Sequence, residues 1–167
     1  HDDLTVDYAA MVAHYKWLLA NGCDGVAVLG TTGEANSFSV GERMGVIEAA
    51  ASSSISKDKI MIGTGCCALP DTIELTKAAL DAGFYQILML PPFYYKSVGD
   101  DALFACFDHV IQRIADNRMR VVVYDFPTMT GLDIGTDLLV RLNQTYPLTV
   151  VGVKDSSGDW NEMQAVA

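Results

Sequence analysis

One lysine stands where this sequence is best suited to covalent chemistry. Lys154 ends the apolar run Val150-Val151-Gly152-Val153-Lys154, a pattern typical of a fully buried strand. Burial disfavours the charged ammonium and lowers a lysine pKa. A lysine at the mouth of such a strand is therefore a candidate nucleophile, of the kind that forms a Schiff base with a carbonyl group. The alternative is a lysine whose stem carries the charge out of the strand end to water.

Further polar residues follow the other apolar runs. Tyr124 ends one of them, and a phenol close to an amine can carry protons, although packing beneath a helix is the alternative. The turn Gly30-Thr31-Thr32-Gly33 offers two hydroxyls and backbone N–H groups that suit a carboxylate, but an ordinary strand-to-helix turn has the same composition. Tyr94 and Tyr95 follow the stiff pair Pro91-Pro92 and are either fixed, protruding residues or core or interface aromatics.

The elements that must position these residues recur as an apolar run, a loop and an amphipathic helix. The centres of five strand-like runs lie 34, 27, 33 and 30 residues apart, close to the roughly 31 residues per unit of a (β/α)8 barrel. Their nearly continuous apolar character indicates a parallel sheet covered by helices. The runs cover residues 25–30, 60–63, 86–90, 121–124 and 150–154.

Helix start and stop signals agree with this repeat. Capping boxes are predicted at Ser39-Val40-Gly41-Glu42 and at Asp71-Thr72-Ile73-Glu74. Gly22 and Gly83 stand where helices that begin near Asp7 and Asp71 should end. Alternation along the last run places Val150, Gly152 and Lys154 on one face.

The predicted fold class is α/β, a TIM (β/α)8 barrel of which about five of the eight strand units are present. Residues 1–167 then form one partial barrel domain. Because five units cannot close the barrel, an open doubly wound sheet is the alternative. The G-x-G-x-x-A pattern in residues 63–68 would suit a dinucleotide there, but Pro70-Asp71 places the helix start too late, so a tight turn is the preferred interpretation.

Composition narrows the class of function. With 50% hydrophobic residues the chain can bury a core, and none of its apolar runs approaches the roughly 20 residues of a membrane span. No signal peptide is visible, so a cytoplasmic setting is expected. A net charge of −10 argues against nucleic acid and anionic membranes as partners. The cysteines form no Cys-x-x-Cys and the histidines stand alone, so no metal is expected.

Taken in order, the strand-end motifs resemble those of the dihydrodipicolinate synthase / N-acetylneuraminate lyase family of class I aldolase-type TIM barrels. The resemblance covers essentially the whole chain. Because the family's barrel is longer, it implies that residues 1–167 lack the first strand and the last two units of the barrel. The motifs that carry it are Gly30-Thr31-Thr32-Gly33-Glu34, Pro92-Phe93-Tyr94-Tyr95, Tyr124-Asp125-Phe126-Pro127 with Thr130-Gly131, and Gly152-Val153-Lys154-Asp155.

The resemblance implies a role for each matching residue. Lys154 corresponds to the lysine that forms a Schiff base with pyruvate, and Tyr124 to the tyrosine that relays protons. Thr31 and Thr32 correspond to the pair that holds the keto-acid carboxylate, flanked by Gly33, with Thr32 also able to join the relay. Either Tyr94 or Tyr95 corresponds to a tyrosine that completes the relay, often across a subunit contact. A homotetramer and the absence of a cofactor are also implied.

Departures from the family pattern suggest a branch. Met129 stands where synthases usually carry an arginine, and a thioether cannot replace a bidentate carboxylate clamp. Ser156, two residues after the lysine, provides the hydroxyl found in aldolases that act on hydroxy acids. Asp125 replaces the usual asparagine, which alters the hydrogen bonding expected in that turn.

These departures favour a lyase that cleaves or forms a C–C bond between pyruvate and an aldehyde, with a 2-keto-3-deoxy sugar acid or a sialic-acid-like substrate. The alternative is a synthase that condenses pyruvate with aspartate semialdehyde. A more distant alternative is a non-catalytic sugar-acid-binding protein on the same fold. In the first two cases the partners are a small keto acid and an aldehyde.

Overall fold

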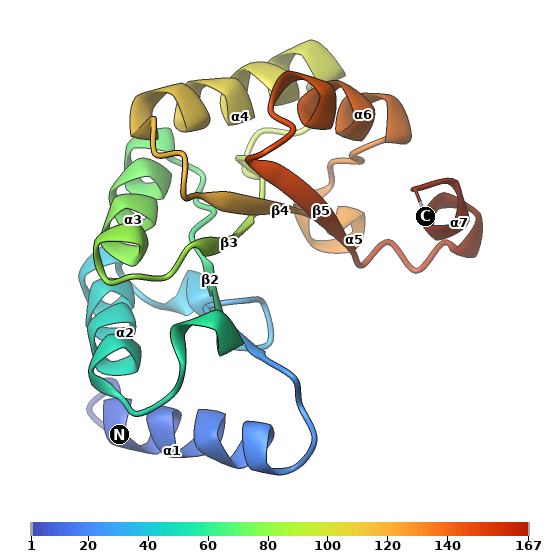
Figure 1. Cartoon of the computed structure of the whole chain (residues 1–167). Coiled ribbons are helices and arrows are strands. Elements are labelled where there is room, and N and C mark those ends of the chain that lie inside the picture. The colour runs from blue at the N-terminus through green and yellow to red at the C-terminus, as the bar shows by residue number, and fades with distance from the viewer. Residues whose placement is uncertain (1, 167) are drawn as a thin grey trace.

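The computed structural model describes residues 2–166, in which five strands alternate with helices (Figure 1). In chain order the elements are α1 (Tyr8–Ala20), β1 (Val26–Val28), the 3-10 helix η1 (Ala35–Ser37), α2 (Val40–Ser52), the 3-10 helix η2 (Lys57–Lys59), β2 (Ile60–Gly63), α3 (Leu69–Asp81), β3 (Gln86–Met89), α4 (Asp100–Ile114), β4 (Arg120–Asp125), α5 (Pro127–Thr130), α6 (Thr136–Thr145), β5 (Val150–Asp155) and α7 (Trp160–Val166).

The strands form one parallel sheet in the order β1-β2-β3-β4-β5, so each strand pairs with its neighbour in sequence. A doubly wound sheet reverses its strand order at a switch point, and this sheet does not. Figure 1 shows helices α1 to α4 and α6 as an arc around one side of the strands, with consecutive helices in contact. The architecture is therefore a partial (β/α)8 barrel, as predicted, and the doubly wound alternative is wrong.

The helix starts confirm one predicted capping box and correct the other. At α2, the Ser39 hydroxyl accepts from the Glu42 N–H while the Glu42 carboxylate accepts from the Ser39 N–H. The box expected at Asp71 does not form, because α3 already begins at Leu69 with a proline in its first turn. There the Thr72 hydroxyl accepts from the Cys66 N–H and closes the turn instead. Gly22 and Gly83 follow the ends of α1 and α3 at positive φ, as predicted.

Two strands differ from expectation. The first was expected over residues 25–30, but β1 ends at Val28 because Leu29 takes the left-handed conformation, with φ of 60°. The last was expected to be fully buried, yet it is the edge strand of the sheet among the described residues, and Val151 is 50% exposed.

The face assigned to Val150 is also corrected. Val121 pairs with Val150 while Val122 pairs with Gly152, so the register shifts at this point and Val151 is an extra residue. Because paired residues point to the same side of a sheet, Val150 shares the face of the buried Val121 and not that of Lys154.

The hydrophobic core lies between the strands and the helical arc. It is built from apolar residues on the outward faces of the strands and the inward faces of α2, α3, α4 and α6, such as Ile62, Leu75, Phe107 and Leu142. No helix within residues 2–166 combines the length and the apolar character that a membrane crossing requires. This core holds the carboxyl ends of the strands in fixed positions.

Candidate active site

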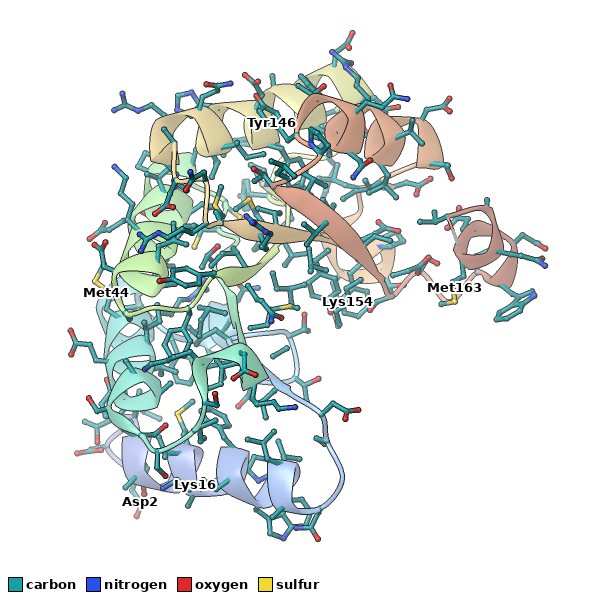
Figure 2. All side chains as sticks on the ribbon, in the orientation of Figure 1. Asp2, Lys16, Met44, Tyr146, Lys154 and Met163 are labelled. Atoms are coloured by element: carbon teal, nitrogen blue, oxygen red, sulfur yellow. The ribbon has the colours of Figure 1, made fainter. Side chains whose placement is uncertain are left out.

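Strands β4 and β5 place Tyr124 and Lys154 side by side. The two residues are partners in the parallel register, so their side chains leave the same face of the sheet. The Lys154 Nζ lies 3.6 Å from the centroid of the Tyr124 ring. Figure 2 shows Lys154 on the side of β5 that faces away from α6. Tyr124 is buried but Lys154 is exposed, because β5 has no further strand beside it in the described residues.

Two hydroxyl groups extend this pair. The Thr31 Oγ1 lies 3.3 Å from the Tyr124 hydroxyl, across a sequence separation of 93 residues. The Lys154 Nζ donates to the Ser156 Oγ at 3.4 Å, and the Ser156 N–H donates to the Asp125 carbonyl at 2.8 Å. Lysine, phenol and two hydroxyls from three separate strand ends therefore form one continuous polar group.

The electrostatics of this group favour a phenol that gives up its proton. Burial raises the pKa of Tyr124, but its interactions with Lys154, Thr31 and Ser156 outweigh burial, and the pKa is lowered overall. An acidified phenol next to an amine can accept a proton in one step and return it in the next. The arrangement therefore meets the chemical needs of Schiff-base formation, where a neutral amine attacks and water leaves.

The remaining predicted residues lie further out. Thr32 and Gly33 are exposed in the turn after β1, and the threonine that contacts Tyr124 is Thr31. Tyr94 and Tyr95 are 73% and 79% exposed and pack edge to face with their ring centroids 5.1 Å apart. Met129, on α5, is 61% exposed. The structure thus brings Lys154, Tyr124, Thr31 and Ser156 together. Tyr94 and Tyr95, on the loop after β3, and Met129, on α5, lie apart from this group.

Arg43, on α2, was not singled out from the sequence. It is only 5% exposed, and its Nη2 donates to the Asn36 Oδ1 at 3.0 Å. Its Nη1 reaches the Cys66 Sγ at 3.1 Å and the Gly65 carbonyl at 3.5 Å. A cavity lined in part by Thr31, Asn36, Gly65 and Tyr124 lies beside these contacts.

Arg43 therefore ties the turn after β1 to the turn after β2. A signal was present in the sequence, because Arg43 shares the buried face of α2 with Val46, Ile47 and Ala50 at helical spacing. A charged residue at such a position has to find polar partners.

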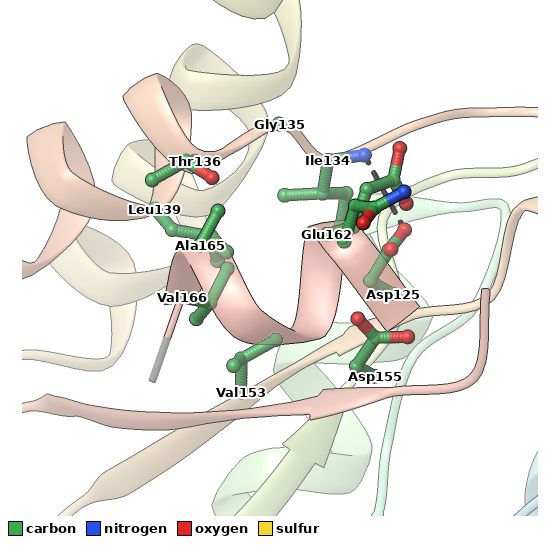
Figure 3. Close-up of a pocket in the computed structure, with 11 residues that line it drawn as sticks. Asp125, Ile134, Gly135, Thr136, Leu139, Val153, Asp155, Glu162, Ala165 and Val166 are labelled. Atoms are coloured by element: carbon green, nitrogen blue, oxygen red, sulfur yellow. Dashed lines mark hydrogen bonds between the residues drawn. The ribbon is translucent and has the colours of Figure 1, made fainter. Parts of the chain in front are cut away.

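A group of carboxylates lies on the other face of the same strand ends. A pocket with a volume of about 280 Å³ lies there, with the carboxyl groups of Asp125, Asp155 and Glu162 at one end and aliphatic side chains at the other (Figure 3). Burial is the main reason that the pKa of Asp125 rises to about 6, helped by the nearby charges of Asp133, Asp155 and Glu162. The Ile134 N–H donates to the Asp125 Oδ1 at 3.3 Å and opposes that rise.

Among the described residues, a set of three carboxylates that overlaps this pocket lies close enough together to suggest a cation site. Asp125, Asp133 and Glu162 bring oxygens within 4.8 Å of one another, a grouping that the sequence pattern did not indicate. Asp133 and Glu162 are exposed, and exposed acidic groups often gather without an ion. We assign no metal to them.

The fold and the polar group together define a class. A sheet wound in one direction, with a lysine and a tyrosine paired at its carboxyl edge, marks part of a (β/α)8 barrel with a candidate Schiff-base lysine. The sequence pattern of the dihydrodipicolinate synthetase family matches residues 1–167, and the chain belongs to that family.

Individual relatives agree with this assignment. The chain is 37% identical over 155 residues to an uncharacterized DapA-like lyase of Chloroflexus aurantiacus, covering 93% of this chain and 51% of the relative. It is 31% identical over 154 residues to a 4-hydroxy-tetrahydrodipicolinate synthase of Rhizobium meliloti, covering 92% and 51%. The chain therefore spans about half the length of the curated relatives that it matches.

Solved structures show the same architecture. A dihydrodipicolinate synthase from Agrobacterium tumefaciens superposes with a TM-score of 0.95 and 38% identity, covering 99% of this chain and 58% of that one. A 2-keto 3-deoxygluconate aldolase from Picrophilus torridus superposes with a TM-score of 0.87 and 25% identity, covering 97% and 56%. The matched portion of each is a partial barrel, like the sheet seen here.

Proposed function

We propose that the protein is a cofactor-independent Schiff-base lyase that cleaves or forms a C–C bond between pyruvate and an aldehyde. The observation that carries this proposal is the contact between Lys154 and Tyr124, continued by Thr31. In this reading Lys154 is the nucleophile, Tyr124 carries protons, and the turn of Thr31, Thr32 and Gly33 receives the keto-acid carboxylate. Tyr94 or Tyr95 completes the relay.

The chemistry runs in balanced steps. The neutral Lys154 amine adds to the ketone carbon. The resulting carbinolamine hydroxyl takes the proton of the Tyr124 phenol and leaves as water, which gives an iminium ion and a Tyr124 phenolate. The C–C bond beyond the iminium then breaks, its electrons pass into the iminium, and the hydroxyl proton of the leaving aldehyde passes to the Tyr124 oxygen. Return of that proton to the enamine carbon and hydrolysis by water release pyruvate and restore the amine.

Met129 and Ser156 support the aldolase branch of this proposal. The exposed Met129 provides no carboxylate clamp, while the Ser156 hydroxyl stands beside Lys154 and can bond a sugar-like hydroxyl. The structural neighbour named as a 2-keto 3-deoxygluconate aldolase is consistent with this branch. The relatives named as 4-hydroxy-tetrahydrodipicolinate synthases support the alternative, in which aspartate semialdehyde is the aldehyde.

Covalent trapping tests the proposal at its first step. Sodium borohydride added with pyruvate should reduce the iminium and leave a stable adduct on Lys154, which peptide mass spectrometry locates. Lys154→Arg should abolish the adduct, and Lys77→Met, a change at an exposed lysine on α3, should not affect it. An unmodified wild-type protein after this treatment would contradict a Schiff-base mechanism.

Substrate assays then separate the branches. Release of pyruvate from 2-keto-3-deoxygluconate or N-acetylneuraminate is the result expected for the aldolase, and consumption of aspartate semialdehyde with pyruvate would indicate the synthase. The non-catalytic alternative predicts sugar-acid binding without turnover, and binding that survives Lys154→Ala.

The setting of the enzyme is part of the same proposal. We place it in the cytoplasm. As the resemblance implies, we propose a homotetramer in which the first strand and the last two units complete the barrel of each subunit. The large exposure of Tyr94 and Tyr95 is consistent with a loop that meets a neighbouring subunit. Sedimentation equilibrium on the protein at its full natural length tests the tetramer, and a monomer at micromolar concentration would contradict it.

A further inference from the structure

The loop that carries the two exposed tyrosines is held by a single polar tether. Residues 91–98 follow β3 and contain Tyr94 and Tyr95, which contact one another. Within residues 2–166, one side-chain hydrogen bond joins this loop to another element, and Lys96 makes it. The position of both tyrosines relative to the rest of the site therefore depends on where that ammonium group is anchored.

The Lys96 ammonium group bridges two backbone carbonyls. Its Nζ donates to the Phe93 carbonyl in its own loop and to the Thr130 carbonyl at the end of α5. A lysine ammonium has three donors and no acceptor, so it is well suited to bridge two backbone carbonyls. The last carbonyls of a helical turn have no partner within the turn, and a cation satisfies them well.

Gly131, the residue after Thr130, leaves room for the aliphatic part of the Lys96 side chain. Gly131 has φ of 64°, and a Cβ atom there would lie 3.0 Å from the Lys96 Cδ and 3.2 Å from its Cε. Glycine at this position therefore provides both the backbone conformation and the space that the stem occupies. Alanine there would be strained by the positive φ, and the Lys96 stem would have to shift by a few tenths of an ångström.

Thr130, whose carbonyl accepts from Lys96, is held by hydrogen bonds and lies close in sequence to Tyr124. Thr130 is buried, and its hydroxyl bonds the Phe126 and Leu132 backbones at 3.0 to 3.2 Å. The α5 turn that it ends follows β4 at once and carries Met129, so Lys96 is joined through a few ordered residues to Tyr124.

We infer that Lys96 is a positioning residue that fixes the tyrosine loop, residues 91–98, against α5. It thereby sets where Tyr94 and Tyr95 stand relative to Tyr124 and Met129. The inference rests on the proposed function, because it assigns the tyrosine loop to proton transfer. Its consequence is specific: loss of the tether slows proton transfer and leaves Schiff-base formation on Lys154 intact.

Exchange of pyruvate methyl protons in D2O measures that consequence without a second substrate. In the Lys154 iminium a methyl C–H bond breaks, its proton passes to a base of the site, and a deuteron returns to the same carbon. Proton NMR follows the loss of the methyl signal, and borohydride trapping reports the iminium separately. Lys96→Met keeps most of the stem but has no donors, while Lys96→Arg keeps donors and charge.

For Lys96→Met we expect exchange to slow by about tenfold, since a misplaced acid–base group loses much of its effect. Trapping with pyruvate should stay at the wild-type level. Lys96→Arg should restore exchange to within about twofold of wild type, and Lys96→Gln, which has one amide donor group, should fall between. Lys77→Met is the matched control on an exposed helix face and should change neither readout.

The outcomes separate the inference from the proposed function. Normal exchange in Lys96→Met with normal trapping would overturn the positioning role alone. Absence of trapping in the wild-type protein would overturn the Schiff-base function instead. Parallel loss of exchange, trapping and thermal stability in both Lys96→Met and Lys96→Gln would show that Lys96 supports the whole fold, which also overturns the inference.

Discussion

The carboxyl edge of the sheet has two ends that are built in opposite ways. At the β1–β2 end, backbone packs against backbone: a Cβ atom on Gly63 would lie 2.1 Å from the Leu29 carbonyl oxygen. The buried Arg43 side chain joins the turns that follow β1 and β2 through its guanidinium group. At the β4–β5 end the contact is between side chains: the ammonium group of the exposed Lys154 lies over the Tyr124 ring.

This difference separates positioning from reactivity. The β1–β2 end has little space to move, so it holds Thr31 through the fixed path of the chain on either side. The β4–β5 end carries groups that change protonation, and their properties depend on neighbouring charges and hydroxyls. We therefore expect changes at the first end to alter stability and changes at the second to alter proton transfer.

Tyr124→Phe should give the largest effect and the sharpest test of this division. Removal of the phenol oxygen takes away the proton carrier, and we expect pyruvate methyl exchange to fall by about 10²-fold or more. The free energy of unfolding should change by less than about 1 kcal/mol, because the ring still fills its buried place. Urea unfolding provides the second measurement. A stability loss as large as the kinetic loss would break the comparison.

Gly63→Ala tests the opposite end. The added methyl group would collide with the Leu29 backbone, which cannot turn aside as a flexible side chain could, so we expect a loss of about 3 kcal/mol in the free energy of unfolding. Gly41→Ala is the matched control, since the α2 site has open space and alanine favours a helix by about 0.5–1 kcal/mol. Equal urea midpoints for the two variants would show that the β1–β2 end is not closed.

Asn36→Ala should have a smaller effect at the same end. It leaves the Arg43 Nη2 without its acceptor, and loss of a hydrogen bond to a charged group costs about 1.5–3 kcal/mol, the lower value applying here because Asn36 is exposed. Ser37→Ala, in the same 3-10 helix, should leave the urea midpoint unchanged. If neither variant changes the urea midpoint, Arg43 does not join the turns after β1 and β2 as described.

The comparison also explains which features could be predicted. The neighbourhood of Tyr124 and Lys154 follows from period-two alternation and from the rule that parallel strands present their carboxyl ends at one edge, and both are local in sequence. The spacing of the apolar runs favoured a barrel but left an open doubly wound sheet as the alternative, which the strand order then excluded. Such patterns are visible in the sequence because each buried position requires an apolar residue.

What could not be predicted depends on contacts between distant segments. The register shift between Val121 and Val122 makes Val151 an extra residue in β5. Gly152 beside it is a residue type found at bulges, but it does not show which residue is the extra one. Leu29 ends β1 in a conformation that leucine rarely adopts, so tertiary packing overrides its propensity. The seat of Lys96 needs Gly131, which is 35 residues away, and neither residue indicates the other.

Asp125→Asn gives the smallest expected effect and tests the β4–β5 end through pH. The folded protein raises the pKa of Asp125 to about 6, whereas an unfolded chain has a value near 4. Between these values the folded state binds more protons than the unfolded state, so the free energy of unfolding falls as the pH rises from about 4 to 6 and stays lower above.

Asparagine cannot ionise but keeps the oxygen that accepts from the Ile134 N–H. Asp125→Asn should therefore stabilise the protein by about 1 kcal/mol at pH 8, after allowance for solvent screening, and the gain should vanish near pH 4. Urea midpoints at pH 4.5 and 8 measure it, with the exposed Asp24→Asn as a control that should shift neither. A gain that is equal at both pH values would mean that the fold does not raise the pKa of the Asp125 carboxyl, and that the charge-dependent character of the β4–β5 end resides in Lys154 and Tyr124 alone.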